Sequence, residues 1–439
     1  ASDVYKRQPL TRWQQQIPII SILALLLLRF AGMSRVCREE QAPYCAPSFY
    51  AYQATTKFAD NPAYALSGPA TNSPYALAAA YLFAFAMADI LRRILKPSHA
   101  HLSSASTLLT WIIRPALLGS SGFWLADWVH GLEQLDEATR STFLVIKIWT
   151  ARAVLFLLVA GAWYWYLSPL SLSVLREPTQ KRDAPPKVAL LGFGNTFGAA
   201  FLLFTSLAFS LLFLLSQPMG QLALSACFVA MVLIAELGDS ERDARLLAAS
   251  KMPNAKDLSA SPSHAPSLLE IVCIGLLGFV AFFSTGHQAT FTAIQWRVAF
   301  VGFPVVTYPW SPLFVVLNAF GPLSVLPAFG VVLLTLWNVA PTRAKVQQEE
   351  TGHVRPMRLP GDILRSALGL LLYVGVLAWS AALWAWFFRR HLMLFKIWVP
   401  RYMMAGLGLL ITDVALLGAV AVAWWIAART AKAFGTLYT

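Results

Sequence analysis

The residues with the clearest chemical potential lie at the edge of an apolar segment, between positions 282 and 297. We predict that His287, Gln288, Trp296 and Arg297 bind an anionic lipid headgroup there. Arginine and histidine donate hydrogen bonds to phosphate, and tryptophan is typical of the membrane–water interface. Apolar residues between 291 and 298 recur at helical spacing, which predicts a short helix lying in that interface. The alternative interpretation is a helix cap with interfacial anchors.

A second stretch, between positions 389 and 401, is strongly basic and adds Lys396 and Arg401 to the candidate headgroup ligands. Phosphate binding would explain this concentration of positive charge. Anchoring of the chain by arginine and lysine side chains that reach the membrane surface would explain it equally well.

No motif predicts a catalytic or metal-binding residue in this chain. It has no Gly-x-Ser-x-Gly elbow, no phosphate-binding Walker loop and no Cys-x-x-Cys pair, and its histidines are scattered. Cys37 and Cys45 lie close in sequence, and both a disulfide and two free thiols are compatible with their spacing. Cys227 and Cys273 fall within apolar segments, where cysteine usually serves packing.

Four of the charged residues inside the predicted spans are functional candidates, because charges within a membrane are costly: Arg114, Asp127, Lys147 and Arg152. Arg114 and Asp127 are too far apart in sequence to form a pair on one helix face. The sequence does not identify their partners.

The elements that must position these residues are predicted to be transmembrane helices. The chain has 439 residues, of which 57% are hydrophobic and 13% charged, whereas a soluble domain has about 25% charged residues. Its apolar residues form blocks of membrane-spanning length. The sequence predicts an all-α polytopic transmembrane bundle of about ten spans. The spans are Ile17–Met33, Tyr75–Leu95, Thr107–Val129, Thr142–Leu167, Thr196–Ser216, Gln221–Leu237, Leu268–Thr285, Leu313–Trp337, Ile363–Phe388 and Met403–Ala428.

The sequence predicts a short N-terminal segment followed by one membrane region with polar loops. Residues 1–13 are interpreted as an N-terminal remnant or a truncated linker, and 14–439 as one multi-pass region. Within it we predict polar loops near 34–73, 176–187, 239–266 and 342–360.

Loop charge predicts the orientation in the membrane. The loops after the second, fourth, sixth and eighth spans, with the C-terminus, carry about twice as many lysines and arginines as the opposite loops. Basic residues concentrate on the cytoplasmic side, so the C-terminus is predicted to be cytoplasmic. The net charge of +13 is then mostly a topology signal, and we predict no nucleic-acid partner.

Three stretches resemble one family. Phe-x-x-Thr-Gly-His-Gln-x-x-Phe-x-x-Ile-x-Trp-x-x-Ala-Phe-Val-Gly-Phe runs from Phe282 to Phe303, and Arg-Arg-His-Leu-Met-x-x-Lys-x-x-x-Pro-Arg runs from Arg389 to Arg401. Together with Cys-Arg-Glu-Glu-Gln at 37–41, they resemble the C-terminal multi-pass membrane region of the GPI ethanolamine-phosphate transferases that act on the third mannose.

The resemblance implies an enzyme of the endoplasmic-reticulum membrane that moves phosphoethanolamine from phosphatidylethanolamine to the GPI glycolipid precursor. In that family a preceding lumenal domain carries a threonine nucleophile and zinc held by aspartate and histidine. No stretch of this chain matches that domain, so zinc is expected outside it. A small multi-pass stabilising subunit is an implied partner. The alternatives from the residues alone are a lipid transporter or scramblase, favoured by the intramembrane charges, and a non-catalytic scaffold subunit.

Overall fold

The computed structural model describes most of the chain. The described residues are 10–33, 74–102, 104–132, 135–177, 187–250, 264–288, 294–343, 359–391, 397–434 and 437–438.

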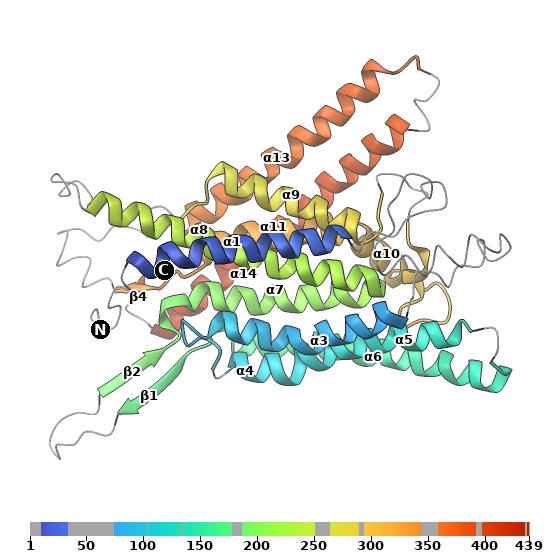
Figure 1. Cartoon of the computed structure of the whole chain (residues 1–439), viewed down its shortest axis with the longest axis horizontal. Helices are drawn as coiled ribbons and strands as arrows, with labels where there is room; N and C mark the ends of the chain where they lie inside the picture. The colour runs from blue at the N-terminus through green and yellow to red at the C-terminus, as the bar shows by residue number, and fades with distance from the viewer. Residues whose placement is uncertain are drawn as a thin grey trace.

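Long helices dominate these residues (Figure 1). The α-helices are α1 (Leu10–Met33), α3 (Pro74–Leu95), α4 (Ser104–Leu108), α5 (Arg114–His130), α6 (Glu137–Leu167), α7 (Thr196–Leu215), α8 (Pro218–Ser250), α9 (Leu268–Ser284), α10 (Trp310–Phe320), α11 (Leu326–Leu336), α13 (Leu359–Phe387) and α14 (Val399–Phe434). Two π-turns join pairs of these into continuous rods: η4 (Leu109–Ile113) links α4 to α5, and η9 (Gly321–Val325) links α10 to α11. Two 3₁₀ turns, η5 (Phe193–Asn195) and η8 (Trp296–Phe300), complete the helical set.

Two short antiparallel pairs depart from the all-α prediction. β1 (Ser173–Glu177) pairs with β2 (Lys187–Leu191), and β3 (Thr342–Arg343) pairs with β4 (Leu437–Tyr438). The first pair lies across the predicted loop at 176–187, and the second begins the predicted loop at 342–360. Both are small connections at one end of the bundle, so the fold class stands (Figure 1).

Every predicted span coincides with a helix. The predicted count of about ten spans is nevertheless too high, because not all of these helices are long and apolar enough to cross a membrane. Seven described helices satisfy this criterion: Ser104–His130, Glu137–Leu167, Phe193–Leu215, Pro218–Ala244, Trp310–Leu336, Leu359–Phe387 and Val399–Ala433. Three helices at predicted spans do not satisfy the criterion. The apolar parts of α1 and α9 have only 10–17 residues, and α3 is not among the seven. α3 carries Asp89, Arg92 and Arg93, which dilute its apolar character.

The predicted polar loop at 239–266 is wrong in its first part, because α8 continues to Ser250. Charged residues in this part of α8 form hydrogen bonds with residues that are distant in the sequence. Asn338 donates from Nδ2 to Asp239 Oδ2 at 2.7 Å, and Arg242 donates to the carbonyl oxygens of His264 and Leu334. These contacts allow a helix to extend where the sequence shows only polarity. Residues 34–73 lie outside the described part of the chain.

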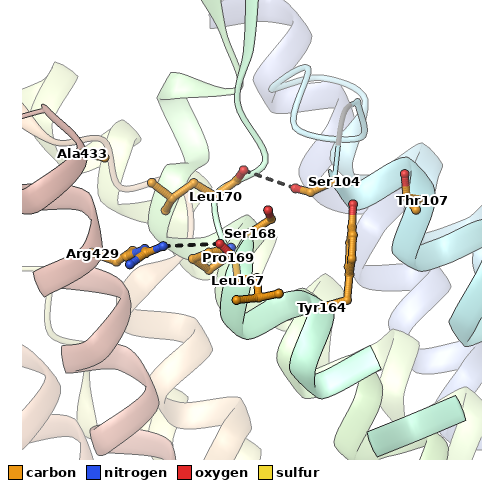
Figure 2. A pocket seen from close by; sticks show the side chains of 9 residues that line it. All are labelled: Ser104, Thr107, Tyr164, Leu167, Ser168, Pro169, Leu170, Arg429 and Ala433. Atoms are coloured by element: carbon orange, nitrogen blue, oxygen red, sulfur yellow. Dashed lines mark hydrogen bonds between the residues drawn. The ribbon is translucent and has the colours of Figure 1, made fainter. Parts of the chain in front are cut away.

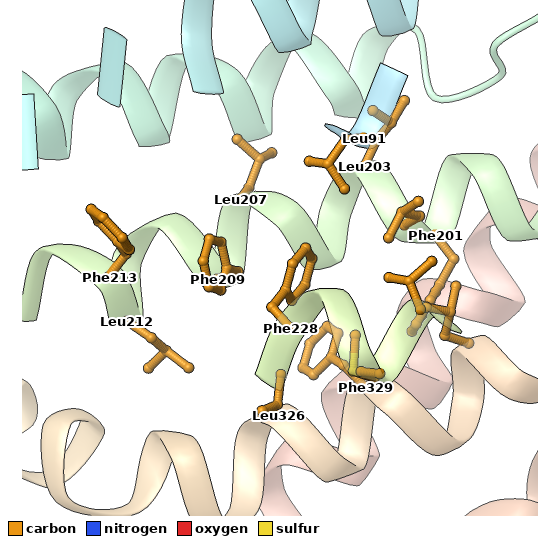
Figure 3. Packing of buried hydrophobic residues seen from close by; sticks show 14 of the residues in the cluster. Leu91, Phe201, Leu203, Leu207, Phe209, Leu212, Phe213, Phe228, Leu326 and Phe329 are labelled. Carbon is orange, nitrogen blue, oxygen red and sulfur yellow. The ribbon is translucent and has the colours of Figure 1, made fainter. Parts of the chain in front are cut away.

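The core lies between α7, α8 and α11, whose apolar segments are largely buried inside the bundle. Their aromatic side chains interdigitate, with the rings of Phe209 and Phe228 stacked at 4.3 Å and those of Phe201 and Phe329 at 5.8 Å (Figure 3). In contrast, α6, α13 and α14 are mostly exposed. A long apolar helix with exposed leucine and tryptophan is the expected surface toward lipid.

Connections alternate between the two ends of the bundle. At one end β3 pairs with β4, Arg429 of α14 donates to the Leu167 carbonyl at the end of α6, and Asp362 of α13 accepts from the His264 amide. The connections after the fourth, sixth and eighth predicted spans and the C-terminal strand therefore share this end, as the alternation of loops requires. We call it the C-terminal end. That it faces the cytoplasm stays a prediction.

Close helix packing yields the first test. A Cβ on Gly198 would lie 2.8 Å from the Leu336 carbonyl oxygen and 3.0 Å from the Trp337 Cα, both of them backbone atoms. We expect Gly198→Ala to destabilise the protein by about 1–3 kcal/mol, because α7 and α11 must separate. Gly418→Ala is the matched control, since nothing lies within 4 Å of that Cβ position. Thermal unfolding in detergent measures both, and equal melting temperatures would contradict the packing argument.

Candidate functional site

α9 ends and α10 begins at the end of the bundle opposite β1 and β2, which we call the η8 end (Figure 1). His287, Gln288, Trp296 and Arg297 lie between these two helices in the sequence. α9 ends at Ser284, the chain turns through Gly286 with φ 85°, and η8 begins at Trp296. The helix predicted between 291 and 298 is a 3₁₀ turn at 296–300 in the part that the structure describes.

His287 is turned into the protein and is only 4% exposed. Its Nδ1 lies 2.9 Å from Thr285 Oγ1, and its Nε2 lies 3.0 Å from Asn318 Oδ1 on α10. Asn318 in turn donates from Nδ2 to the Leu215 carbonyl at the end of α7. Because the asparagine nitrogen is used there, its oxygen must accept, and the proton of this contact belongs to His287 Nε2. The imidazole thus joins the ends of three helices.

The same turn is held from its other side by Gln295, which donates from Nε2 to the Thr285 carbonyl at 2.9 Å. The ring of Phe282 stacks on the imidazole at 5.3 Å. A lipid phosphate could reach the His287 ring nitrogens only by displacing Thr285 or Asn318. The geometry therefore favours a positioning role for His287, closer to the helix-cap interpretation, while Gln288 beside it is half-buried.

Charge gathers on a neighbouring surface formed by α5, α6 and η8. Asp127 Oδ1 lies 2.9 Å from Lys147 Nζ, and Asp127 Oδ2 lies 4.0 Å from an Arg297 guanidinium nitrogen. The aspartate and lysine side chains are 16% and 12% exposed, whereas that of Arg297 is 49% exposed. One carboxylate thus faces two cations, and the outer cation is open to the surroundings.

Arg152 adds a third cation close to this group. It donates from Nε to the Gly302 carbonyl just after η8, at 2.9 Å, and its guanidinium lies over the ring of Trp149. Gly302 has φ 79°, a left-handed conformation that a residue with a Cβ adopts only with strain. Trp149 and Trp296 are both 63% exposed, as expected at a membrane boundary. We call Asp127, Lys147, Arg152, Trp296 and Arg297 the α5–α6–η8 cluster.

The structure therefore brings two of the predicted residues, Trp296 and Arg297, together with three intramembrane charges. Arg401 lies on α14 instead, with its guanidinium over the Trp398 ring at 5.6 Å. Lys396, Cys37 and Cys45 lie outside the described residues, so the binding and disulfide predictions for them stay predictions. Cys227 is buried as predicted, but Cys273 is exposed, so the packing interpretation holds for Cys227 alone.

Two partners were missed from the sequence. Asn318 lies in an apolar helix, and an isolated buried amide there is a signal that could have identified it. Asp89 pairs with Arg114 at 2.6 Å across α3 and α5. Within the described residues no group of three histidine, cysteine, aspartate or glutamate side chains is arranged to hold a metal ion.

Removal of the shared carboxylate tests the α5–α6–η8 cluster. We expect Asp127→Asn to destabilise the protein by about 3 kcal/mol, because Lys147 is left charged and poorly solvated. Asp136→Asn is the matched control, since Asp136 is an exposed N-cap of α6 and asparagine caps equally well. Thermal unfolding should separate the two variants. A melting temperature for Asp127→Asn equal to that of the control would show that the pair does not stabilise the bundle.

A second comparison separates positioning from binding at His287. His287→Ala leaves the Asn318 oxygen without its donor, so we expect a loss of about 1–3 kcal/mol and a lower protein level. Gln288→Ala, at the adjacent half-buried position, should change stability by less than about 0.5 kcal/mol. If His287→Ala has normal stability and a normal protein level but binds lipid more weakly, the positioning role is wrong and His287 is a headgroup ligand.

Comparison with known proteins gives a consistent result. The chain is 28% identical over 398 residues to GPI ethanolamine phosphate transferase 3 of Eremothecium gossypii and 26% identical over 411 residues to that of Saccharomyces cerevisiae. These matches cover 90% and 92% of this chain. The catalytic subunit of the Homo sapiens enzyme is 28% identical over 285 residues, which is 59% of this chain.

No family model matches the chain. No solved structure matches it either. The chain spans about a third of the length of the fungal relatives, 34% and 35%. It is therefore similar, over nearly all of its own length, to part of GPI ethanolamine phosphate transferase 3, which confirms the resemblance that its sequence motifs predict.

Proposed function

We propose that this chain is the membrane part of a GPI ethanolamine phosphate transferase that acts on the third mannose. The observation that carries the proposal is the similarity over about 90% of the chain to relatives that bear this name. The helical bundle supports it, because substrates attached to lipid require an enzyme that meets them at a membrane. The endoplasmic reticulum is the membrane we assign, with the C-terminus in the cytoplasm.

The donor in this proposal is phosphatidylethanolamine, and the acceptor is a mannose hydroxyl of the GPI precursor. Among the described residues, no group of three histidine, cysteine, aspartate or glutamate side chains could hold a metal ion. As the resemblance to the family implies, we assign the threonine nucleophile and zinc to a lumenal domain of the whole protein. A small multi-pass subunit that stabilises the bundle is the proposed protein partner.

The α5–α6–η8 cluster is the part of this chain that we assign to substrate binding. Two cations, Lys147 and Arg297, face the Asp127 carboxylate, and Arg152 binds the Gly302 carbonyl next to η8, so the cluster has an excess of positive charge suited to a lipid phosphate. Arg297 is half-exposed and can turn toward a headgroup without leaving Lys147 unpaired. Trp296 and Trp149 flank the cluster at the level where headgroups lie. In this role the cluster holds the phosphate while other groups perform the transfer.

The transporter alternative loses its main support. Its evidence was the set of charges inside apolar segments, and each of these has a partner in the structure: Asp89 for Arg114, Asp127 for Lys147 and the Gly302 carbonyl for Arg152. Paired charges of this kind join helices and need no polar path through the bundle. A scaffold role without transfer is an outcome of the experiment below.

The proposal is tested with a chimera. This chain replaces the matching third of the Saccharomyces cerevisiae relative, and GPI precursors are analysed by mass spectrometry in cells that lack the native protein. We expect ethanolamine phosphate on the third mannose. A chimera that is present at a normal level but yields only precursors without that group would overturn the transferase assignment and favour a scaffold.

The cluster's role is tested in the same chimera by Arg297→Ala. Loss of a charge-assisted hydrogen bond to phosphate should raise the apparent KM for the donor lipid about tenfold at unchanged protein level. Arg140→Ala is the matched control, because Arg140 is an exposed arginine at the start of α6, outside the cluster. Equal KM values for the two variants would remove Arg297 from substrate binding while leaving the transferase proposal intact.

A further inference from the structure

A polar cavity lies at the C-terminal end of the bundle, far from the α5–α6–η8 cluster. It has a volume of about 450 Å³ and lies between α4, the end of α6 and α14 (Figure 2). Ser104, Thr107, Tyr164, Ser168 and Arg429 supply its polar atoms. The substrate site proposed above does not use any of these residues.

Arg429, the cation in this cavity, makes only a weak hydrogen bond to the part of the protein that the structure describes. Arg429 is exposed, and its one guanidinium contact among the described residues is a long hydrogen bond of 3.4 Å to the Leu167 carbonyl. Figure 2 shows it reaching from α14 toward the loop at the end of α6, while the Tyr164 hydroxyl points toward Thr107 and Ser104 on the other side. A guanidinium that faces hydroxyl groups across an open cavity is an arrangement that suits a phosphate with oxygen-rich substituents.

Aromatic residues place the cavity at a membrane surface. Directly adjacent to its lining, the rings of Trp163 and Tyr166 stack at 5.8 Å, and those of Tyr166 and Trp425 at 4.9 Å. Trp163, Tyr166 and Trp424 are also large exposed side chains. Tryptophan and tyrosine collect at the level of lipid headgroups, so the cavity opens where headgroups are found. A phospholipid beside α6 and α14 can keep its acyl chains against the exposed apolar faces of these helices.

We propose that this cavity binds the phosphate headgroup of a phospholipid in the leaflet at the C-terminal end of the bundle. Arg429 contacts the phosphate, and the hydroxyl groups of Tyr164, Ser168 and Thr107 contact the polar substituent. The bound lipid then fills the cavity between α6 and α14, beside the stacked rings of Tyr166 and Trp425 that also join these helices. This site lies at the opposite end of the bundle from the α5–α6–η8 cluster, and it does not depend on the proposed function.

The test is native mass spectrometry of the full chain after reconstitution in nanodiscs of mixed phosphatidylcholine and phosphatidylserine and release into detergent. We expect a phospholipid adduct, and about a tenfold loss of its affinity in Arg429→Ala. Lys432→Ala is the matched control, because it removes a positive charge from an exposed residue of the last turn of α14 outside the cavity lining. Tyr164→Phe, which removes one hydroxyl group, should cause a several-fold loss.

Three results would overturn the proposal. The first is equal adduct affinity in Arg429→Ala and Lys432→Ala. The second is absence of any adduct from the wild-type chain. The third is retention of soluble glycerophosphate by the delipidated protein as strongly as phospholipid, since the ligand would then be a free phosphate and the acyl chains would contribute nothing. Melting temperatures of the variants exclude loss of fold as the cause, because Arg429 is exposed and its removal should leave the bundle intact.

Discussion

The arrangement at the η8 end depends on one carboxylate. Asp127 lies among helices that face hydrocarbon, where an unpaired lysine is costly. By pairing with Lys147 it fixes α5 against α6, and by facing Arg297 it ties both helices to η8. Because the same carboxylate serves two cations, neither is fully neutralised. The site therefore keeps an excess of positive charge, which a membrane protein retains at a cost and which an anionic ligand would reduce.

Polar side chains join helices in a layer at each end of the bundle. At the C-terminal end, Asp239, Arg242 and Asp362 join α8, α11 and the segment before α9. At the η8 end, His287 and Asn318 join the ends of α7, α9 and α10. Between these layers the core of α7, α8 and α11 is packed with aromatic and aliphatic side chains (Figure 3). Each layer satisfies the polar groups at helix ends, so the apolar core can have the length of a membrane.

The helices could be predicted from the sequence because their signal is local: about twenty apolar residues in a row specify a membrane span wherever they occur. The continuation of α8 past Leu237 could not be predicted, since it depends on Asn338 and on the carbonyls of His264 and Leu334, which are distant in sequence. The pairing of Arg114 with Asp89 could not be predicted for the same reason, because the two residues lie on different helices. Arg297 was recognised by its residue type at a membrane boundary, whereas its partner Asp127 was known only as an unexplained charge.

His287 and Arg297 belong to the same motif but lie in different environments. They are ten positions apart in one sequence motif, yet the imidazole is enclosed by Thr285, Phe282 and Asn318 while the guanidinium is exposed. A buried polar group with satisfied partners specifies where the chain turns, and an exposed cation beside tryptophan can meet a ligand. Gln295, next to η8, donates to the Thr285 carbonyl of the turn that His287 holds, and this contact links the turn to the segment that carries Arg297. In the function we propose, Arg297 contacts the headgroup, and His287 fixes the turn next to the segment that carries Arg297.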